Sequence, residues 1–377
     1  MVVVKKNNRW YVVLYMPPYG QQWFAGGTTK KEAELKEAEL KLKKEAGTIS
    51  SAKYALGSFL DQWLETVKSN LASSTYESYV QTVNLHLKPA LGNIALGKLK
   101  PIDIQRYYTA ELNGGRKDNK KTVGSGLSST TVLYHHRVLH RALETAVKWG
   151  LISRNPADMV DPPRKAKKEI NTLNEKQIHI LLSGIKDEYL YMPVFLAVMT
   201  GMRRGEILGL RWRDVDLQNG IIYVTQALYQ RKAGIPTFTE PKTPQSKRAI
   251  QISDAVIKAL EKHKAEQDKN RSYFTSKYAP YDLVCCMQDG KPINPESLSS
   301  YFADTTKRLG FPVRFHDLRH THASLLLKAG INPKIVSERL GHNSIEITLN
   351  TYSHVMPGLQ KEAADKFEEM LKNGTSH

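Results

Sequence analysis

Cysteine is nearly absent from this chain of 377 residues, which contains only Cys285 and Cys286. Adjacent cysteines rarely bridge each other, so the sequence offers no disulfide framework and fits a reducing compartment such as the cytoplasm. We expect both to be small buried residues of a strand from Leu283 to Met287. No apolar run is long enough to cross a bilayer and no signal peptide is visible, so we expect no membrane association.

Acidic residues are also in short supply, with 37 Asp and Glu against 55 Lys and Arg and a formal net charge of +18. This excess favours a polyanionic partner such as nucleic acid, although a ribosomal protein or a membrane-surface binder would show it too. Neither a P-loop nor a dinucleotide-binding glycine motif occurs, so we expect no cofactor of these kinds. The chain length predicts two or three domains.

The first 50 residues predict a small sheet followed by a helix. Three strand-like runs are separated by turn residues, at Val2–Lys5, Arg9–Tyr15 and Gln21–Phe24. A helix from about Lys30 to Glu45 follows, and Thr29 with Glu32 fits a capping box at its start. Such a sheet can enter the major groove of DNA, or it can be an ordinary solvated sheet with Trp10 and Trp23 as its core.

Residues 54–160 predict a group of helices. Apolar residues recur at helical spacing in four segments, at Leu56–Val67, Tyr76–Val83, Pro101–Leu112 and Val132–Val147. The runs that begin at Ser73 and Ser128 are rich in Ser and Thr and fit helix N-caps. The stretch 113–126 fits a glycine-rich basic loop, and a linker rich in proline and lysine covers 155–168.

Residues 170–377 predict a mixed α and β domain. A buried helix from Leu190 to Met199 is broken by Gly201, and a new helix starts near Arg203. A strand is expected at 221–226, followed by a hairpin across Lys242 to a strand at 248–252. Later helices are expected at 255–266 and 297–309. An amphipathic tail helix at 360–371 could pack on this domain or on another protomer.

Arginine, histidine and tyrosine gather near the C-terminus in a pattern that suits phosphodiester chemistry. His316 and Arg319 stand one helical turn apart and can reach one ligand. Gly341 fits the end of a helix and leaves His342 just beyond it. Tyr352 lies among polar residues, which indicates a presented hydroxyl rather than a core ring. Together these groups can supply a nucleophile, a proton relay and a cationic clamp.

An upstream segment completes an ordered set of motifs. Thr200–Glu206 reads Thr-Gly-x-Arg-x-x-Glu, Lys242 lies in the predicted turn, and His-x-x-Arg, Leu-Gly-His and a tyrosine follow, the last being Tyr352. In these residues the chain resembles the tyrosine recombinase (phage integrase) family, whose signature has the same elements in the same order. The ordered set is far more specific than any one of its motifs.

The resemblance implies a site-specific DNA recombinase that cleaves and rejoins DNA through a 3′-phosphotyrosyl intermediate. Such an enzyme integrates or excises a mobile element of phage or transposon origin. Arg203 and Arg319 would clamp the non-bridging phosphate oxygens, which a planar guanidinium matches and a lysine does not. Tyr352 would be the nucleophile. The two guanidiniums should therefore face one anion-sized hollow.

The remaining motif residues have supporting roles in this resemblance. Lys242 would protonate the leaving 5′-oxygen, with Lys232, Lys247 and Arg248 as nearby rivals for this role. His316 would serve as base or hydrogen-bond partner, His342 would donate to the phosphate, and Glu206 would orient an arginine or a histidine. His316 and His320 have a zinc-binding spacing, but the glutamate of a zinc-protease helix is missing and Arg319 would repel a cation, so we expect no metal.

The resemblance also implies a multidomain, mainly α protein with small β-sheets. It has an arm-type DNA-binding domain at 1–50, a helical core-binding domain at 54–160 and a mixed α+β catalytic domain at 170–377. The partner would be double-stranded DNA with core and arm attachment sites, bound by a homotetramer in the cytoplasm of a bacterial host. A host bending protein and an excision factor are further candidate partners. The expected DNA contacts are Lys5, Arg9, Tyr11, Trp23, Lys120, Lys121, Arg137, Arg141, Lys165 and Lys167.

Two other functions fit the same residues. A DNA-binding regulator could keep this fold after losing catalysis, but the complete set of six catalytic residue types argues against such decay. A topoisomerase-like nicking-closing enzyme would use the same chemistry on a single duplex. The expected three-stranded sheet at 1–50 favours an integrase over simpler recombinases that lack such a module.

Overall fold

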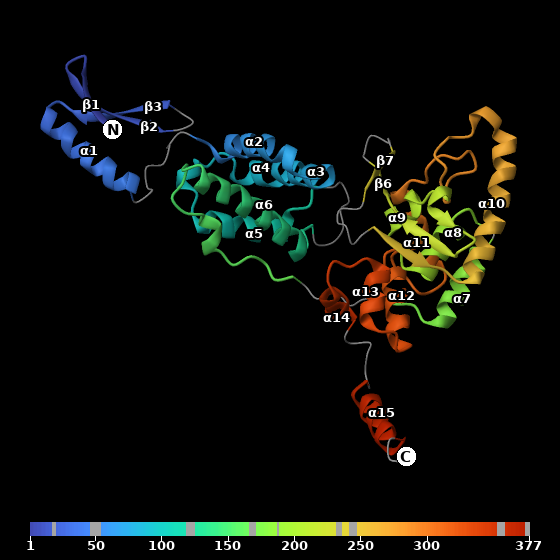
Figure 1. Ribbon diagram of the computed structural model, residues 1–377. Helices are drawn as coiled ribbons and strands as arrows, with labels where there is room; N and C mark the ends of the chain where they lie inside the picture. The colour runs from blue at the N-terminus through green and yellow to red at the C-terminus, as the bar shows by residue number, and fades with distance from the viewer. Residues whose placement is uncertain are drawn as a thin grey trace. The chain divides into compact units, whose positions relative to one another are not determined.

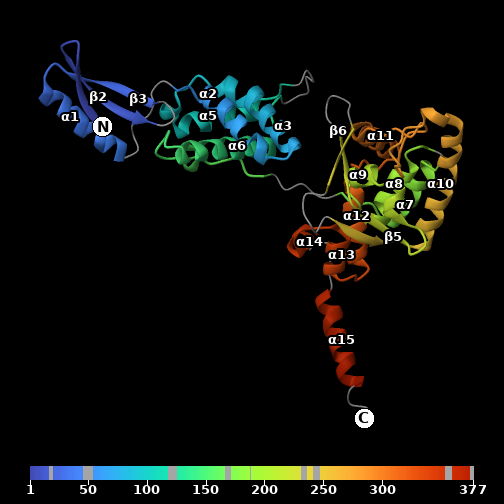
Figure 2. The ribbon, with the colours of Figure 1, turned by 45° about the horizontal axis from the view of Figure 1, so that its top comes forward.

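The computed structural model describes residues 1–16, 20–45, 54–117, 125–165, 171–186, 188–230, 236–240, 247–352 and 359–373. The chain divides into two compact units, Met1–Lys168 and Glu169–His377. Figures 1 and 2 show the helices and strands of both. Within the described ranges, no helix combines the length and apolar character needed to cross a membrane.

The first unit begins with an antiparallel sheet of order β1-β2-β3, formed by Val2–Lys6, Arg9–Met16 and Gly20–Gly27. Helix α1 (Lys30–Glu45) packs on this sheet and helps to bury Val12 and Leu14. The predicted capping box at its start is confirmed. Glu32 donates its backbone N–H to Thr29 Oγ1 at 3.3 Å, and Thr29 donates its own to Glu32 Oε2 at 3.0 Å.

The sheet has two different faces. Directly paired residues of antiparallel strands point to the same face of a sheet. Lys5 pairs with Trp10, and both therefore lie on the face that packs against α1. Lys6 pairs with Arg9 on the opposite side, where Tyr11 and Trp23 also lie. Trp23 is 46% exposed, so it is not the core residue of the alternative interpretation.

The described residues from 54 to 165 are mainly helical. Their α-helices are α2 (Leu56–Val67), α3 (Ser73–Thr82), α4 (Lys88–Leu91), α5 (Pro101–Gly114) and α6 (Ser129–Lys148). Phe59, Trp63 and Leu139 are fully buried among them. The predicted helices are confirmed, as is the Ser128 cap, whose side chain accepts from the Thr131 backbone N–H.

Two details of the helical region differ from the prediction. Ala72 is the N-cap of α3, and Ser73 already belongs to the helix, so the predicted Ser/Thr cap there is wrong. A π-helical stretch over Val83–Leu87 joins α3 to α4, which periodicity alone does not reveal.

The α-helices and β-strands among the described residues of the second unit are α7 (Glu175–Gly184), α8 (Tyr191–Thr200), α9 (Arg204–Gly209), β4 (Val215–Asp216), β5 (Ile221–Val224), β6 (Ala227–Gln230), β7 (Pro236–Thr239), β8 (Arg248–Gln251), α10 (Asp254–Phe274), α11 (Pro295–Arg308), α12 (Asp317–Lys328), α13 (Pro333–Leu340), α14 (Ile345–Tyr352) and α15 (Leu359–Asn373). Helix α8 is buried in the main core and contacts both α9 and α12. This buried helix is the support on which the candidate site is built.

The strands of the second unit correct one prediction. The strands predicted at 221–226 and 248–252 form as β5 and β8, which pair with each other antiparallel in a sheet of order β4-β5-β8. Between them in the chain, β6 and β7 form a separate hairpin. The segment that contains Lys242 therefore connects two strands of different sheets, β7 and β8, and does not join β5 directly to β8. Lys242 itself lies outside the described residues.

The cysteines and the tail also refine the prediction. Cys285 is buried and both cysteines are free, but the expected strand at 283–287 is replaced by two isolated bridges, Arg211–Leu283 and Cys286–Pro292. Helix α15 forms as predicted, and the Phe367 and Met370 side chains on its apolar face are 62% and 71% exposed.

Candidate active site

Gly201 links the buried helix α8 to α9 and sets the direction of Arg203. Its φ of +67° lies in the left-handed region, which glycine enters without a Cβ clash. A Cβ at this position would meet His322 and Leu340 at 2.7 Å, so the turn is packed closely against α12 and α13. Arg203 follows with extended backbone as the N-cap of α9, and its side chain reaches the end of α13.

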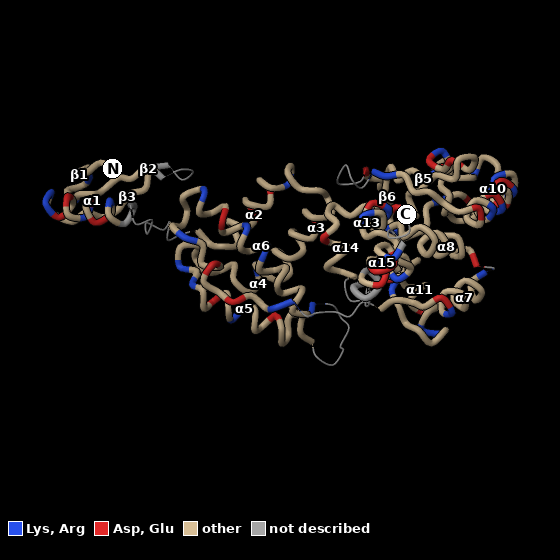
Figure 3. The backbone as a smooth tube through the Cα atoms, turned by 60° about the horizontal axis from the view of Figure 1, so that its bottom comes forward, with Lys and Arg blue, Asp and Glu red and all other residues tan. Residues whose placement is uncertain are grey.

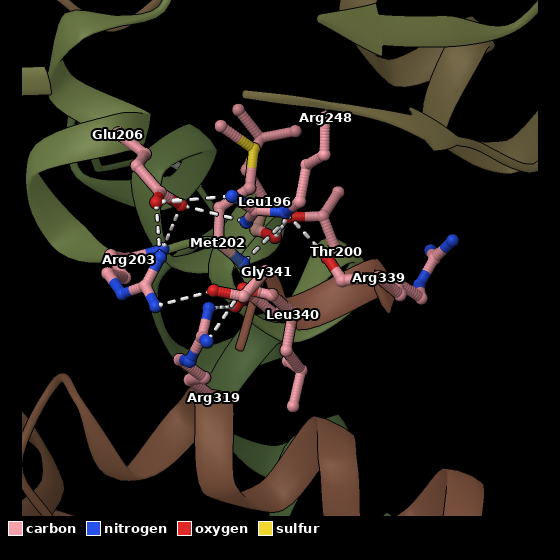
Figure 4. Close-up of polar contacts among 11 residues, drawn as sticks. Leu196, Thr200, Met202, Arg203, Glu206, Arg248, Arg319, Arg339, Leu340 and Gly341 are labelled. Atoms are coloured by element: carbon pink, nitrogen blue, oxygen red, sulfur yellow. Dashed lines mark hydrogen bonds and ion pairs between the residues drawn. The ribbon is translucent and has the colours of Figure 1, made fainter. Parts of the chain in front are cut away.

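Glu206 holds two arginines in place (Figure 4). Its carboxylate accepts from Arg203 Nη1 at 2.7 Å and from Arg248 Nη2 at 2.9 Å. Burial on its own would raise the pKa of Glu206, but the bonds and charges of Arg248 and then Arg203 outweigh it, so this pKa lies below its usual value. The ionised carboxylate therefore fixes the orientation of both guanidiniums.

The guanidiniums of Arg203 and Arg319 meet at the end of α13. Arg203 Nη2 donates to the carbonyl oxygen of Gly341 at 3.0 Å, and Arg319 Nη2 donates to that of the preceding Leu340 at 2.7 Å. Arg319 Nη1 also donates to the Gly201 carbonyl at 2.9 Å. Adjacent carbonyl groups thus anchor both arginines, as Figure 4 shows. Two positive charges so close together favour an anion between or beside them.

The two arginines differ in how far their side chains are buried. Arg319 is 3% exposed, whereas the Arg203 side chain is 37% exposed. Burial, and then the charge of Arg203, lower the pKa of Arg319 to about 9, which still leaves it charged at neutral pH. A buried cation with its donors already oriented does not need to reorganise when negative charge develops nearby.

A cavity of about 660 Å³ opens beside these arginines. It is lined by Arg203, Gly205, Glu206, Ala227, Thr239, Glu240, His316, Arg319, His320, His342, Asn343, Ile347, Thr351 and Tyr352. The structure thus brings together five of the six side chains that the sequence predicts to be catalytic, from α12, α14, the N-caps of α9 and α12 and the C-terminal end of α13. The sixth, Lys242, is outside the described residues.

His316 and His342 enter the cavity as neutral rings. Burial, and then His320 and Arg319, lower the pKa of His316 to about 4. Burial, and then Arg319 and Arg203, lower the pKa of His342 to about 4. The Nδ1 atom of His342 shares a hydrogen bond with Thr348 Oγ1 at 2.8 Å. A neutral imidazole can both donate and accept, so these rings can contact a phosphate without adding charge to the clamp.

Tyr352 is buried, which contradicts the presented hydroxyl that its polar sequence neighbours predict. It is 1% exposed at the end of α14. Its ring belongs to a cluster supplied by α12 and α13: Ala323, Leu327, Val336 and Leu340. Burial raises the pKa of Tyr352 to about 12, although Arg319 acts in the opposite direction. The phenol is therefore protonated at neutral pH.

Sequence reasoning missed two residues of the site. The sequence singles out His320 only for its zinc-type spacing from His316, but its Nδ1 atom lies 2.7 Å from the Tyr352 hydroxyl. Arg248 was considered only as a rival of Lys242, but it binds Glu206 and donates from Nε to the Arg339 carbonyl at 2.7 Å. His320 had a weak signal, its place directly after Arg319. Arg248 had none, because its partners are remote in sequence.

Another polar cluster lies in the first unit. His86, Glu111 and His135 bring their ligand-type atoms within 4.8 Å of one another, a spacing that could hold a metal ion. These atoms already have hydrogen-bond partners. His86 Nδ1 bonds Glu111 Oε2 at 2.7 Å, and His135 Nδ1 bonds the Tyr107 hydroxyl at 2.8 Å. This geometry is that of a buried hydrogen-bond network.

The predicted DNA contacts are placed unevenly. Arg9, Arg137, Arg141 and Lys165 are exposed, while Lys120, Lys121 and Lys167 lie outside the described residues. Arg141 Nη1 donates to the Tyr79 hydroxyl at 3.0 Å. Basic and acidic residues alternate along the backbone of α10 in Figure 3, so net charge does not by itself mark a DNA-facing surface.

Comparisons with known proteins match most of this chain. The family model "Phage integrase family" matches residues 167–358, half of the chain, and "Phage integrase, N-terminal SAM-like domain" matches residues 55–112. A tyrosine recombinase XerC-like protein of Caldanaerobacter subterraneus subsp. tengcongensis is 29% identical over 368 residues, 92% of this chain and 91% of that protein.

Solved structures show the same fold. One is the Tn1549 transposon integrase in complex with a circular intermediate DNA, with a TM-score of 0.71 and 22% sequence identity. The match covers 84% of this chain and 100% of that chain. A lambda integrase tetramer bound to a Holliday junction has a TM-score of 0.58 at 18% identity, covering 92% and 93%. With the family match over half of its length, this chain belongs to the phage integrase family of tyrosine recombinases, which are DNA-recombining enzymes.

Proposed function

We propose that this recombinase cleaves and rejoins DNA at specific sites through a 3′-phosphotyrosyl intermediate on Tyr352, and so integrates or excises a mobile element. The observation that carries the proposal is the meeting of Arg203 and Arg319 at neighbouring carbonyl groups, beside a cavity that Tyr352 also lines. A phosphodiester under attack gathers negative charge on its non-bridging oxygens. Two oriented guanidiniums are suited to stabilise that charge.

In the proposed step, the Tyr352 oxygen bonds to phosphorus as the bond to the 5′-oxygen breaks. The phosphotyrosine conserves the bond energy, so a 5′-hydroxyl of another strand can reverse the step without a metal or another cofactor. Lys242 would protonate the leaving 5′-oxygen. His342 would donate a hydrogen bond to the phosphate, and His316 would act as base or hydrogen-bond partner, both from the cavity wall.

The arrangement on DNA belongs to the same proposal. Residues 54–160 would bind the core site and residues 170–377 would cut it, while the sheet of residues 1–50 would bind an arm site. On that sheet, Arg9, Tyr11 and Trp23 share one face with Lys6, whose Nζ lies 5.3 Å from the Trp23 ring. This face is therefore the better candidate for the DNA contact than the face of Lys5.

A homotetramer would join two duplexes, as in the lambda integrase structure bound to a Holliday junction. We propose that it works in the cytoplasm of a bacterial host, with a host bending protein and an excision factor as candidate partners. Because Lys and Arg outnumber acidic residues in the chain, binding should rest largely on phosphate contacts. Raising the salt concentration should therefore weaken it steeply.

A topoisomerase-like enzyme would relax a supercoiled plasmid but would not exchange strands between two duplexes. A regulator without catalysis would bind DNA and form no covalent adduct. The closely gathered site argues against the regulator, because a protein that only binds DNA has no need for a phenol next to a paired-arginine clamp.

The test begins with trapping. The full-length protein is incubated with sheared genomic DNA of the organism that encodes it, denatured with detergent, and the protein-linked strands are sequenced to define the cleaved site. A nicked suicide duplex of that sequence should then give a covalent adduct without added metal. Tyr352→Phe should abolish the adduct but retain DNA binding. Tyr223→Phe is the matched control, since Tyr223 is 42% exposed on β5, and it should react like the wild type. An adduct that survives Tyr352→Phe removes Tyr352 as the nucleophile.

Lys242 has its own test. Lys242→Ala should slow cleavage, and a 5′-bridging phosphorothiolate should restore it, because the thiolate leaves without needing a proton. Lys247→Ala is the control, and it should cleave the ordinary duplex normally. If the sulfur substrate restores Lys247→Ala and not Lys242→Ala, the general acid is Lys247.

A further inference from the structure

The nucleophile has a partner that no signature motif includes. His320 is on α12, next to Arg319, and its Nδ1 atom lies 2.7 Å from the hydroxyl oxygen of Tyr352. The two ring centroids are 5.7 Å apart. Both residues line the cavity beside the arginines. The phenol therefore lies within proton-transfer distance of an imidazole.

The surroundings of His320 suit a ring that gains and returns a proton. Burial lowers the pKa of His320, which keeps the ring neutral near pH 7, while Asp317 acts in the opposite direction. The charged and titratable groups that face it come from α12, from the segment before it and from the segments around α14: Arg314, His316, Asp317, Arg319, His342 and Tyr352. Asp317 is 2% exposed and can balance an imidazolium during the reaction.

His316 is placed differently. Its ring stands edge-on to that of His320, with centroids 5.0 Å apart. Among the described residues, the histidine that shares a hydrogen bond with the Tyr352 hydroxyl is His320 and not His316. His316 can thus contact the phosphate while its neighbour holds the phenol.

We propose that His320 is a further catalytic residue, which positions the Tyr352 hydroxyl through Nδ1 and accepts its proton during attack on the phosphate. The inference deepens the proposed function and rests on it. As the phenol oxygen forms its bond to phosphorus, its proton moves to His320 Nδ1, and the bond from phosphorus to the 5′-oxygen breaks. The leaving oxygen takes a proton from the general acid, for which Lys242 is proposed. In religation His320 returns the proton to the phenol oxygen.

Two substitutions separate positioning from proton transfer. In His320→Asn the side-chain carbonyl can stand near the former Nδ1 atom and accept from the phenol, but it cannot take the proton. His320→Ala loses both functions. We expect both variants of the full-length protein to bind the trapped duplex within about twofold of wild type and to cleave it at least ~10²-fold more slowly in single turnover. His179→Asn carries the same change on the exposed part of α7 and should cleave like the wild type.

The pH profile and chemical rescue add readouts that a structural role would not move. The wild-type cleavage rate should fall as the pH drops through the lowered pKa of His320, and this acid limb should be missing from His320→Asn. Added imidazole should restore cleavage to His320→Ala, with more basic substituted imidazoles acting faster. The proposal is overturned if His320→Asn cleaves as fast as the wild type and shows the same acid limb. It is also overturned if His320→Ala cleaves slowly and no imidazole restores the rate, while His320→Asn cleaves slowly but keeps the acid limb.

A measurement without DNA keeps this result distinct from a failure of the proposed function. In protein labelled with ¹⁵N-histidine, the His320 Nδ1 resonance is identified by its loss in His320→Asn, and it should shift in Tyr352→Phe. No shift overturns the pairing. If the wild type forms no Tyr352-dependent adduct, the proposed function fails and the proton-acceptor role fails with it, while the resonance shift alone then decides the pairing.

Discussion

Glu206 carries the sharpest prediction, because one carboxylate orients both Arg203 and Arg248. It is 4% exposed and accepts two hydrogen bonds from each arginine. In Glu206→Gln one oxygen becomes an amide group, which cannot accept and faces guanidinium donors. Two of the four bonds are then lost, at about 1.5–3 kcal/mol for each bond to a charged group, or about 3–6 kcal/mol in all. Removing one partner of a buried ion pair costs a similar amount, about 3–5 kcal/mol.

The assay is thermal and urea unfolding of the full-length protein at pH 7, followed by circular dichroism. For a unit of about 200 residues, each kcal/mol shifts Tm by about 2–4 °C, so the second unit should lose about 6–24 °C. Glu266→Gln is the matched control. Its carboxylate pairs with Lys269 at the same i, i+3 spacing, but it is 66% exposed, so the loss should be about 0–1 kcal/mol.

Acid pH gives a second readout of the same carboxylate. Because the folded pKa of Glu206 is below its ordinary value of 4.5, its stabilisation is fully present above pH 4.5 and is lost as the pH falls through the folded pKa. Glu206→Gln should lack this part of the acid destabilisation. Equal unfolding free energies of Glu206→Gln and wild type at pH 7 would refute the reasoning, since the carboxylate would then not be holding the arginines.

Three further predictions follow from the same geometry. Gly341→Ala should lose about 1–2 kcal/mol of unfolding free energy and slow cleavage, because its φ of +68° is left-handed and the new Cβ would meet Arg248 at 3.0 Å; Gly310→Ala, also at positive φ but in open space, measures the backbone cost alone. Arg319→Lys should keep DNA binding and lose cleavage by ~10²-fold or more, because an ammonium cannot hold two carbonyl oxygens and a phosphate together; near-normal single-turnover cleavage would contradict the clamp. Burial lowers the pKa of four histidines to about 4: His135, His316, His322 and His342. The urea midpoint of unfolding should therefore fall as the pH drops from about 6.5 to about 4, because the unfolded chain takes up protons first. A rise in stability over this pH range would contradict the prediction.

Local patterns predicted the parts of the fold that local physics decides. The helix at Lys30–Glu45 and the Thr29 cap are specified by residues within one turn of each other. The break at Gly201 is equally local, because only the left-handed conformation ends α8 there. The predicted cap of α3 is wrong because several neighbouring Ser and Thr residues could serve as caps, and the helix starts with Ala72 as its N-cap instead.

The errors in the site come from contacts that the sequence does not bring near one another. Tyr352 has polar neighbours along the chain, but its apolar contacts come from α12 and α13, so periodicity predicted exposure where the structure has burial. His320 is 32 residues from the phenol that it contacts. The predicted connection across Lys242 is longer than a simple hairpin turn, because β6 and β7 come between the paired strands β5 and β8.

Helix ends that lie within the motifs explain why motifs far apart in the sequence can specify one site. A guanidinium has five N–H donors, and the hydrogen bonds between described residues occupy two of those of Arg319 with the main-chain carbonyls of Gly201 and Leu340. Both carbonyls belong to helix ends that glycines terminate, and such ends leave carbonyls without helical partners. The arginines satisfy these groups and are held in position by them, with donors left over for a phosphate. The Thr-Gly-x-Arg, His-x-x-Arg and Leu-Gly-His motifs are therefore three parts of one structural unit, in which two helix ends orient the charge that the reaction requires.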